Sequence, residues 1–537
     1  GNITIYHGGN NITPFEIGDD SSLGSDAIIT TGEFQIPTDS SFLKSYSLGN
    51  ITILTEDIAV EPIIVTPPLV TPALPTPPIS PTITFNSPLL ESESSSSSAE
   101  VLIGSISSND SNKALFERLE NSYSEQFKSH LNLYERVNLS PTSLDTVQQT
   151  LGNVEALMDI RPGVLYVYFA ASNAKESSLP NSNGLNPDDE LELLLITDHG
   201  QTVRRKVEGV TRGEVMAVAK DFYAQITNVV SSSSQYLPPA QQLYDWFIAP
   251  VEDALQQQGI QSLALSMDTG LRTLPVAALH NGEEFLVERY SLGVIPSFSL
   301  TDFNPQNFLY TQLENTQLLA MGASQFPSQQ LLPAVPKELN VVTKAFHDSK
   351  VFLNEDFTLD NLQNQVARND FGIVHLASHG VFEPGEPRNS YIQLWDQPLR
   401  LDQVHTLGLQ GADIALMVLS ACNTALGDHE AEYGFAGLAV NAGVQTSVAS
   451  LWPISDEGTL GMMTYFYEHL QQQPVRAVAL RQAQLAMLQG ELTFADGTLY
   501  GLGEMELAHF PNLEYHGRWN FEHPFYWSTY TLVGSPW

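Results

Sequence analysis

Two short apolar runs, at residues 373–377 and 414–419, constrain the fold of this 537-residue chain more than any other feature. Each has the length and composition of a strand that is buried on both faces of a parallel sheet. The first run leads into His379 and the second into Cys422. Because function collects at the carboxyl ends of parallel strands, neighbouring strands would place these two side chains side by side. A thiol beside an imidazole is the minimum that nucleophilic catalysis by cysteine requires.

From residue 111 onwards the chain alternates between helical and extended patterns. Besides the two runs above, we expect strands at 163–171, 191–197, 203–210, 262–268, 318–322, 351–353, 391–395 and 446–451, and a hairpin at 285–296. We expect helices within 111–159 and at 213–227, 240–257, 336–346, 358–367, 432–442, 456–472 and 475–488, with a short one from Asp402. This alternation predicts an α/β fold, a parallel sheet with helices on both faces.

Two segments of different composition precede the α/β part. Residues 1–58 hold short β-rich runs broken by Gly, Asn and Asp, and the phrase Gly-Asn-Ile-Thr-Ile occurs at 1–5 and again at 49–53. Residues 59–113 are rich in proline and then in serine, which predicts an extended, protease-sensitive linker, with a glycosylated or processed stalk as the alternative. We therefore divide the chain into 1–58, 59–113, 114–312 and 313–537.

Four separated motifs carry a family resemblance. They are HLASHG at 375–380, LSACNTALG at 419–427, GLAVNAGVQTSVASLWPISD at 437–456 and HPFYWSTYTLVGSPW at 523–537. In this order they resemble the CHAT domain, a caspase-like family in the clan of caspases, metacaspases, gingipains and separase. The resemblance runs from about Val164 to the end of the sequence. It implies a caspase-like fold and a His–Cys dyad, whose two positions only His379 and Cys422 match.

The resemblance also assigns parts to the domains. It implies that residues 114–312, after a helical lead-in, are a degenerate caspase-like half without a nucleophile, which packs against and shapes the active half at 313–537. Residues 1–58 resemble the tail of a filamentous-haemagglutinin-type β-helix, which implies a secreted or cell-surface protein. The sequence leaves the localisation itself undetermined.

Each dyad residue has an expected role and a plainer alternative. Cys422 is the expected nucleophile, whereas a lone cysteine is otherwise an inert buried side chain. His379 is the expected general base, because imidazole exchanges protons near neutral pH. Gly380 permits close backbone approach and can offer its N–H to an oxyanion. His375 lies on the same face of a regular strand as His379, and we expect it to be a hydrogen-bonded core histidine.

Three acids are candidates for binding substrate. Asp456 opens a helix after Leu451-Trp452, and separase has an acid after a similar Leu-Trp, so the likeness implies an acidic pocket for arginine or lysine. The alternative for Asp456 is helix capping. Asp428 and Glu430, in the loop after Cys422, are further candidates, with plain solvated acids as the alternative.

Composition limits the partners and cofactors. The net charge of −38 argues against nucleic acid and suits a basic peptide, although solubility alone explains it too. The single cysteine rules out an internal disulfide, and no apolar run is long enough for a membrane-spanning helix. His375, His379 and Cys422 lack metal-ligand spacing, so we expect no metal and no cofactor. The chain begins at Gly1 without an initiator Met, from which we expect a fragment or a processed product.

These observations favour a cysteine endopeptidase that cleaves a peptide or protein substrate after a basic residue. We expect it to be regulated by a protein partner or by processing. The alternatives are a catalytically silent caspase-like scaffold for protein–protein interaction and a cysteine hydrolase acting on a small amide.

Overall fold

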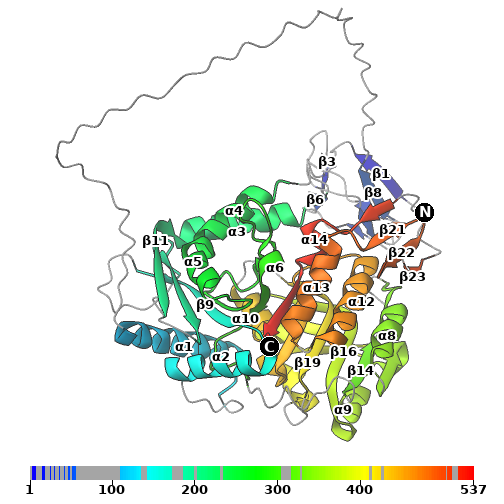
Figure 1. Cartoon of the computed structure of the whole chain (residues 1–537). Coiled ribbons are helices and arrows are strands. Elements are labelled where there is room, and N and C mark those ends of the chain that lie inside the picture. Colours follow the sequence, from blue (N-terminus) through cyan, green and yellow to red (C-terminus); the bar gives the residue numbers. More distant parts are fainter. Residues whose placement is uncertain are drawn as a thin grey trace, which may run out of the picture. The chain divides into compact units, whose positions relative to one another are not determined.

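The computed structural model describes most of the chain beyond residue 108. It covers residues 109–134, 142–171, 185–198, 202–229, 234–303, 316–326, 329, 331–346, 348–409, 414–424, 429–473, 475–503, 505–510 and 518–537, and the backbone of short strands between residues 3 and 55. The side chains of 3–55, 109–110, 421–424 and 429–430 lie outside the described part. The chain divides into two compact units, Gly1–Ser98 and Ala99–Trp537 (Figure 1).

The first unit contains short strands, as its β-rich runs predicted. Strand β8 (Ile51–Thr55) pairs with β1 (Ile3–His7) in parallel and with β7 (Tyr46–Leu48) in antiparallel orientation. The register joins Ile3 to Ile51 and Ile5 to Ile53, so the Ile-Thr-Ile parts of the two copies of the repeated phrase are paired residue for residue. Short strands also occur at β2 (Phe15–Ile17), β3 (Gly24–Ser25), β4 (Ile29–Thr30), β5 (Gln35–Ile36) and β6 (Ser41–Phe42).

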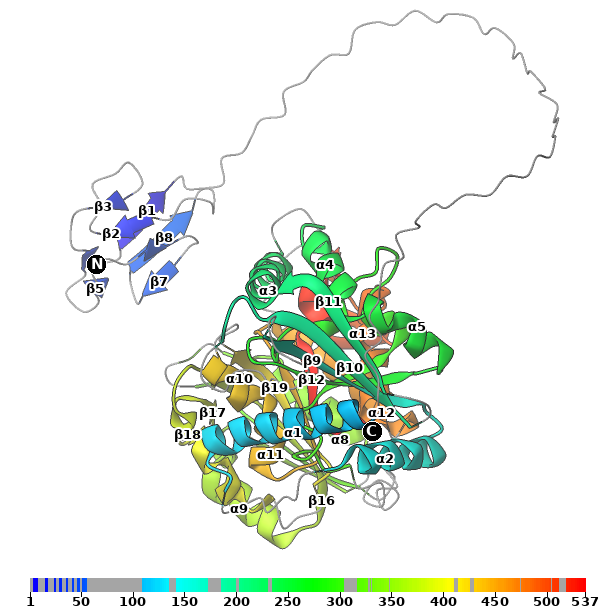
Figure 2. The ribbon, with the colours of Figure 1, turned by 90° about the vertical axis from the view of Figure 1, so that its left-hand side faces the viewer.

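A 13-stranded sheet organises the second unit (Figures 1 and 2). Its main path runs β11 (Val203–Thr211), β10 (Glu190–Thr197), β9 (Pro162–Ala170), β12 (Ser262–Met267), β13 (Ser291–Val294), β25 (Tyr530–Gly534), β20 (Thr446–Ser450), β19 (Leu416–Thr424), β16 (Phe371–Phe382), β14 (Gln317–Gly322) and β15 (Ser349–Leu353). Strands β17 (Tyr391–Gln393) and β18 (Pro398–Arg400) extend it from β16. The predicted class is confirmed: a mixed α/β fold with a large, mostly parallel sheet.

Strand β9 shows why the sheet needs helices on both faces. All nine of its residues are buried, so neither face meets water. Val164, Tyr166 and Tyr168 pack in one cluster with α1 (Asn109–Leu131) and α2 (Leu144–Met158). Leu165 and Val167 join the other core, to which α3 (Arg212–Ile226), α4 (Leu237–Phe247) and α5 (Ala249–Gln257) contribute. Alternate residues of one strand therefore serve two cores, as the two-residue repeat of a strand dictates.

Helices also cover both faces of the sheet around β19 and β16. On one face lie α8 (Val335–Lys344), α12 (Asp456–Gln472) and α13 (Arg476–Leu488) (Figures 1 and 2). The other face carries α10 (His429–Ala436) and α11 (Leu438–Ala442). Other elements of this unit include α6 (Leu286–Arg289), α9 (Leu359–Arg368), α14 (Pro524–Trp527) and the 3₁₀ turns η4 (Pro387–Asn389) and η5 (Leu401–Leu407).

The last strand joins the two parts of the sheet. Strand β25 pairs in parallel with β13 on one side and antiparallel with β20 on the other. The indole N–H of the buried Trp537 donates to Ser262 Oγ on β12 at 2.8 Å. Residues 114–312 and 313–537, expected as two halves, therefore belong to one compact unit with one continuous sheet.

The hairpin expected at 285–296 is wrong. Residues 286–289 form α6, and β13 runs parallel to β12. The Glu288 carboxylate accepts the backbone N–H of Phe285 at 2.7 Å, which starts the helix. The chain then returns to the same end of the sheet, and the next strand is parallel.

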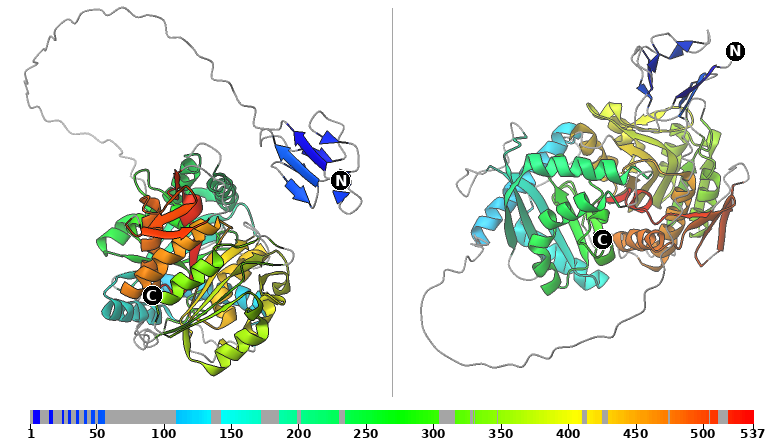
Figure 3. Two further views of the ribbon diagram at one scale, coloured as in Figure 1. Left: turned by 90° about the vertical axis from the view of Figure 1, so that its right-hand side faces the viewer. Right: turned by 90° about the horizontal axis from the view of Figure 1, so that it is seen from above.

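A second difference lies at residues 493–520. There the chain forms a four-stranded antiparallel sheet of β23 (Met505–His509), β22 (Thr498–Gly501), β21 (Thr493–Ala495) and β24 (Arg518–Asn520), which the sequence did not predict. It lies beside α12 (Figure 3), where the backbone N–H of Leu502 donates to Tyr465 Oη at 2.8 Å. Among the described helices, none is long and apolar enough to cross a membrane.

Candidate active site

The register of two neighbouring strands brings His379 and Cys422 together. Strands β16 and β19 run parallel, with His379 opposite Ala421 and Gly380 opposite Cys422. Neighbouring strands lie about 4.8 Å apart and residues rise about 3.3 Å, so the Cα atoms of His379 and Cys422 lie about 6 Å apart. Both residues lie toward the carboxyl ends of their strands, where we expected them. The side chain of Cys422 is outside the described part of the chain.

An irregularity in β16 lies directly before His379. Leu376 is opposite Leu419, but the next aligned pair is His379 and Ala421, so β16 holds one residue more than β19 over this interval. Such a bulge bends the strand and re-aims the side chains beyond it. Ser378, within the bulge, donates its hydroxyl to the backbone carbonyl of Gln393 on β17, which ties the irregular segment to the next strand. The regular alternation that would put His375 and His379 on one face therefore does not extend across the bulge.

His379 is half-buried against an aromatic ring. The centroids of the Phe326 and His379 rings lie 5.1 Å apart, with the ring planes tilted by 58°. Phe326 belongs to the connection between β14 and α8, so this connection covers one side of the imidazole. A half-buried imidazole keeps part of its surface open to solvent, while packing limits its rotation.

His375 is a core residue, as the sequence predicted. Its side chain is fully buried, and its Nδ1 lies 3.0 Å from Tyr467 Oη of α12. Its Nε2 lies 3.0 Å from Glu338 Oε1 of α8, off the line of a hydrogen bond. The imidazole is thus used in packing the strand against two helices.

Asp456 is the first residue of α12 and does not act as its N-cap. Ser455 is the cap, since its Oγ accepts the backbone N–H of Gly458 at 3.2 Å. Asp456 Oδ2 instead accepts the backbone N–H of Ala334, which precedes α8, at 3.0 Å. Burial raises the pKa of Asp456 to about 6, although the Ala334 N–H acts in the opposite direction.

One connecting segment contacts both His379 and Asp456. Phe326 packs on His379, and Ala334 of the same β14–α8 connection donates to Asp456. Asp456 also begins the helix that follows β20, the neighbour of β19. The structure therefore places His379, the backbone of Cys422 and Asp456 at one edge of the sheet.

The other predicted site residues are placed less fully. Gly380 lies within β16, paired on one side with β19 and on the other with β17. Asp428 lies outside the described residues, and so does the side chain of Glu430 in α10. Within the described part of the chain, no group of three or more His, Cys, Asp or Glu side chains is placed to hold a metal ion.

A buried carboxylate in α10 was missed from the sequence. Glu432, in the first turns of α10, is fully buried and accepts the backbone N–H of Gly270 at 2.7 Å. Burial raises its pKa to about 7, although Arg272 and the Gly270 N–H lower it. The sequence did contain a signal: Glu432 lies three residues before Phe435 and four before Ala436, a spacing that puts it on the apolar face of a helix.

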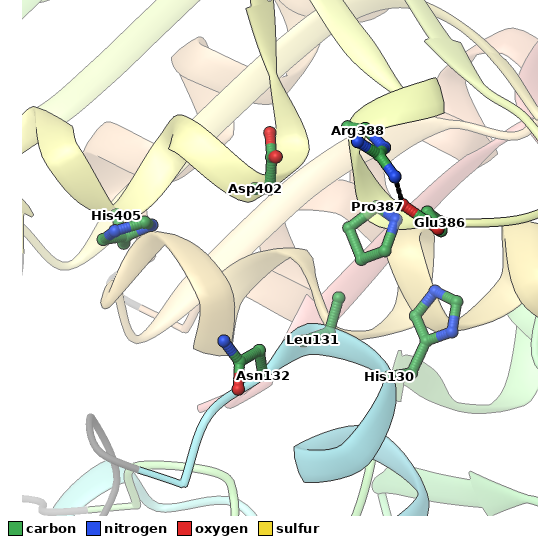
Figure 4. A pocket seen from close by; sticks show the side chains of 8 residues that line it. All are labelled: His130, Leu131, Asn132, Glu386, Pro387, Arg388, Asp402 and His405. Carbon is green, nitrogen blue, oxygen red and sulfur yellow. Dashed lines mark ion pairs between the residues drawn. The ribbon is translucent and has the colours of Figure 1, made fainter.

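A pocket of about 510 Å³ lies beyond the end of β16 (Figure 4). The end of α1, the turn that follows β16 and the turn η5 form its walls. The residues that line it are His130, Leu131, Asn132, Glu386, Pro387, Arg388, Asp402 and His405. Arg388 forms an ion pair with Glu386, and both side chains are largely exposed. The mixed charges of the lining define no single class of ligand.

A sequence model of the CHAT domain matches residues 237–535, which is more than half of the chain. No curated protein matches the chain. The family match does not include residues 1–58, so it gives no support to their resemblance to a filamentous-haemagglutinin-type β-helix.

Several solved structures are similar at low identity. Two separase–securin complexes of Saccharomyces cerevisiae match with 10% identity and a TM-score of 0.41, and with 11% identity and a TM-score of 0.43. They cover 72% and 81% of this chain, which spans only 30% and 34% of theirs. An Arg-specific cysteine proteinase, gingipain R, matches with 11% identity and a TM-score of 0.34, covering 60% of this chain and 74% of its own. The chain thus spans about a third of the separase chains.

Proposed function

This chain belongs to the CHAT domain family, and from that membership we propose that it is a cysteine endopeptidase with His379 and Cys422 as its catalytic dyad. The observation that carries the proposal is the register of β16 and β19. It puts Cys422 one residue beyond the position opposite His379, at the carboxyl edge of the sheet. Cys422 is the only cysteine in the sequence, so no other thiol competes for the role.

The proposed reaction has two halves. In the first, His379 takes the thiol proton, the Cys422 sulfur attacks the peptide carbonyl carbon, and His379 returns the proton to the leaving amine. In the second, water attacks the thioester with His379 as base, and the thiol and the new carboxyl end are released. Backbone N–H groups would stabilise the oxyanion in both halves. Gly380, the donor expected from the sequence, is paired with both β17 and β19, so its N–H would have to leave a strand pair to take this role.

We propose that Asp456 selects a basic side chain, arginine before lysine. Its Oδ2 accepts from Ala334, and among the described residues nothing donates to Oδ1. A planar guanidinium bonds two carboxylate oxygens at once, which an ammonium cannot match. Because Asp456 is largely withdrawn from water, its charge would act on a bound cation with little screening.

A cleavage assay with three variants tests the dyad. A peptide library is digested with the full chain, and labelling of the sole thiol by iodoacetamide is followed in parallel. Cys422→Ala should abolish cleavage, and His379→Ala should lower it by about 10²–10⁴-fold. The matched control is His469→Ala, because His469 lies 13 residues along α12 from Asp456, about 20 Å away by the rise of a helix. Cleavage at the wild-type rate by Cys422→Ala would rule out the dyad.

The same assay decides the silent-scaffold alternative. A scaffold should cleave no peptide, and its Cys422 should react with iodoacetamide no faster than a free thiol. An enzyme should show both cleavage and enhanced labelling, and both should fall together in His379→Ala.

Specificity is tested by profiling the library with Asp456→Asn. The amide retains an oxygen for the Ala334 N–H and removes the negative charge. As a pocket acid, Asp456 should support arginine selectively, so the variant should lose arginine substrates and keep others. Equal preference in wild type and variant would reject the assignment.

A further inference from the structure

The Glu432 carboxylate connects two distant parts of the chain. It belongs to α10, the first described helix after the Cys422 strand. Its Oε2 accepts the backbone N–H of Gly270 at 2.7 Å, and Thr273 Oγ1 lies 3.5 Å from its Oε1. Gly270 and Thr273 belong to the turn that follows β12, about 160 residues earlier in the sequence.

The turn that receives Glu432 is itself held firmly. Asp268 is 2% exposed and accepts the backbone N–H groups of Phe169 at 3.1 Å and of Thr269 at 2.7 Å. It also forms a buried ion pair with Arg212 at 2.8 Å. Fixed on three sides, this turn offers the Gly270 N–H as an anchor that cannot easily shift.

Arg272 provides the charge opposite Glu432. Its guanidinium is fully buried and donates from Nε to the Met267 carbonyl at 3.1 Å and from Nη2 to Gln126 Oε1 at 2.8 Å. Its central carbon lies 4.6 Å from the ring centroid of Tyr433, the neighbour of Glu432 in α10. Arg272 therefore favours a carboxylate at Glu432, against the cost of burying it.

Helix α10 also packs on the strand that carries His379. The rings of Phe435 in α10 and Phe382 at the end of β16 meet edge to face, with centroids 5.6 Å apart. Phe382 lies three residues beyond His379. The same short helix thus contacts residues 114–312 through Glu432 and the end of the His379 strand through Phe435.

We propose that Glu432 is a positioning residue, which holds α10 and the Cys422 segment before it in place against the turn after β12. In this arrangement the turn at the carboxyl end of β12, in residues 114–312, anchors the part of residues 313–537 that carries Cys422. The inference rests on the proposed dyad, because it is the geometry of Cys422 and His379 that the anchor would maintain.

The test measures the reactivity of the sole thiol across pH. Rates of Cys422 alkylation by iodoacetamide are measured from pH 5 to pH 10 on the full chain. Glu432→Asp shortens the side chain and withdraws the carboxylate from Gly270, while Glu432→Met keeps the length without an acceptor. In both, we expect the plateau rate of the ionised thiol to change by about tenfold or more, as small misplacements do at a reacting centre. If one of these variants does not fold, the rate measured for the other is sufficient to test the proposal.

Two controls separate positioning from loss of stability. Glu432→Gln keeps an oxygen for Gly270 and should stay within about twofold of wild type. Glu120→Asp shortens an equally buried carboxylate of α1, which accepts the N–H groups of Phe298 at 2.9 Å and Ser299 at 2.7 Å, within residues 114–312. It should lower stability and leave the alkylation rate of Cys422 within about twofold.

The outcomes are distinct from those of the dyad test. Folded Glu432→Asp or Glu432→Met with a wild-type plateau rate would overturn the positioning role. The dyad would instead be rejected if the wild-type protein cleaves no peptide and its alkylation rate rises with pH around the pKa of a free thiol, about 8.5. Even in that case, the plateau alkylation rate of each Glu432 variant, divided by that of wild type, would show whether Glu432 positions Cys422.

Discussion

Replacing Asp456 by asparagine should raise the stability of the protein in a pH-dependent way. Burial raises the pKa of this carboxyl from an ordinary value of 3.8 to about 6. The folded protein therefore binds the proton more tightly than the unfolded chain does. The contribution of Asp456 to stability is fully present below pH 3.8 and is lost as the pH rises through 6. The amide of Asp456→Asn does not titrate, so the variant escapes this loss.

The magnitude follows from the change in pKa on folding. A rise from 3.8 to about 6 corresponds to about 3 kcal/mol, at about 1.36 kcal/mol for each pH unit. This is an upper value, since part of the carboxyl still contacts water. The hydrogen bond from Ala334 survives in the variant through the amide oxygen, so the charge is the main change.

The assay is urea unfolding of wild type and Asp456→Asn at several pH values from about 4 to about 8. The free energy of unfolding of the variant minus that of wild type should grow by up to about 3 kcal/mol over this range. Asp360→Asn, at the exposed start of α9, is the matched control and should change stability by less than about 1 kcal/mol. A difference between variant and wild type that is constant over this pH range would refute the reasoning.

Three further predictions use other parts of the chain. Glu432→Gln should gain up to about 3 kcal/mol over wild type in urea unfolding across the same pH range, because burial raises the pKa of this carboxyl from 4.5 to about 7; a flat difference would contradict it. Trp537→Ala should cost about 3–5 kcal/mol, seen as a lower urea midpoint, since a fully buried indole and its bond to Ser262 are lost; an unchanged midpoint would show that this end does not stabilise the sheet. The structure corrects the end of the expected linker, because α1 already begins at Asn109; limited proteolysis should cut first within residues 59–108, and first cuts elsewhere would contradict the linker assignment.

Local sequence patterns were sufficient for the strands that matter most. The apolar runs before His379 and Cys422 predicted buried parallel strands, and β16 and β19 are neighbours in parallel. The nine-residue run of β9 was likewise identified by its unbroken apolar character. Such patterns are readable because burial on both faces leaves no position for a polar side chain. The core role of His375 followed from the same reasoning.

The positions of the acids depended on contacts that the sequence does not contain. Asp456 could be interpreted as a helix cap or as a pocket acid, and the structure makes Ser455 the cap and Ala334 the partner of Asp456. Glu432 went unnoticed because its partner, Gly270, lies about 160 residues away. A carboxylate in an apolar helix becomes interpretable only when the donor that compensates its burial is known.

The sequence by itself determined the fold class and the family resemblance, and it singled out His379 and Cys422 as candidates, because these inferences depend on residue type and short spacing. Only the tertiary structure decided that β25 lies between β13 and β20, that a bulge precedes His379, and that Glu432 meets the turn after β12. The physical reason is the same in each case. Strand order, register and the burial of charge are set by the free energy of the whole packed sheet, in which distant segments compensate one another.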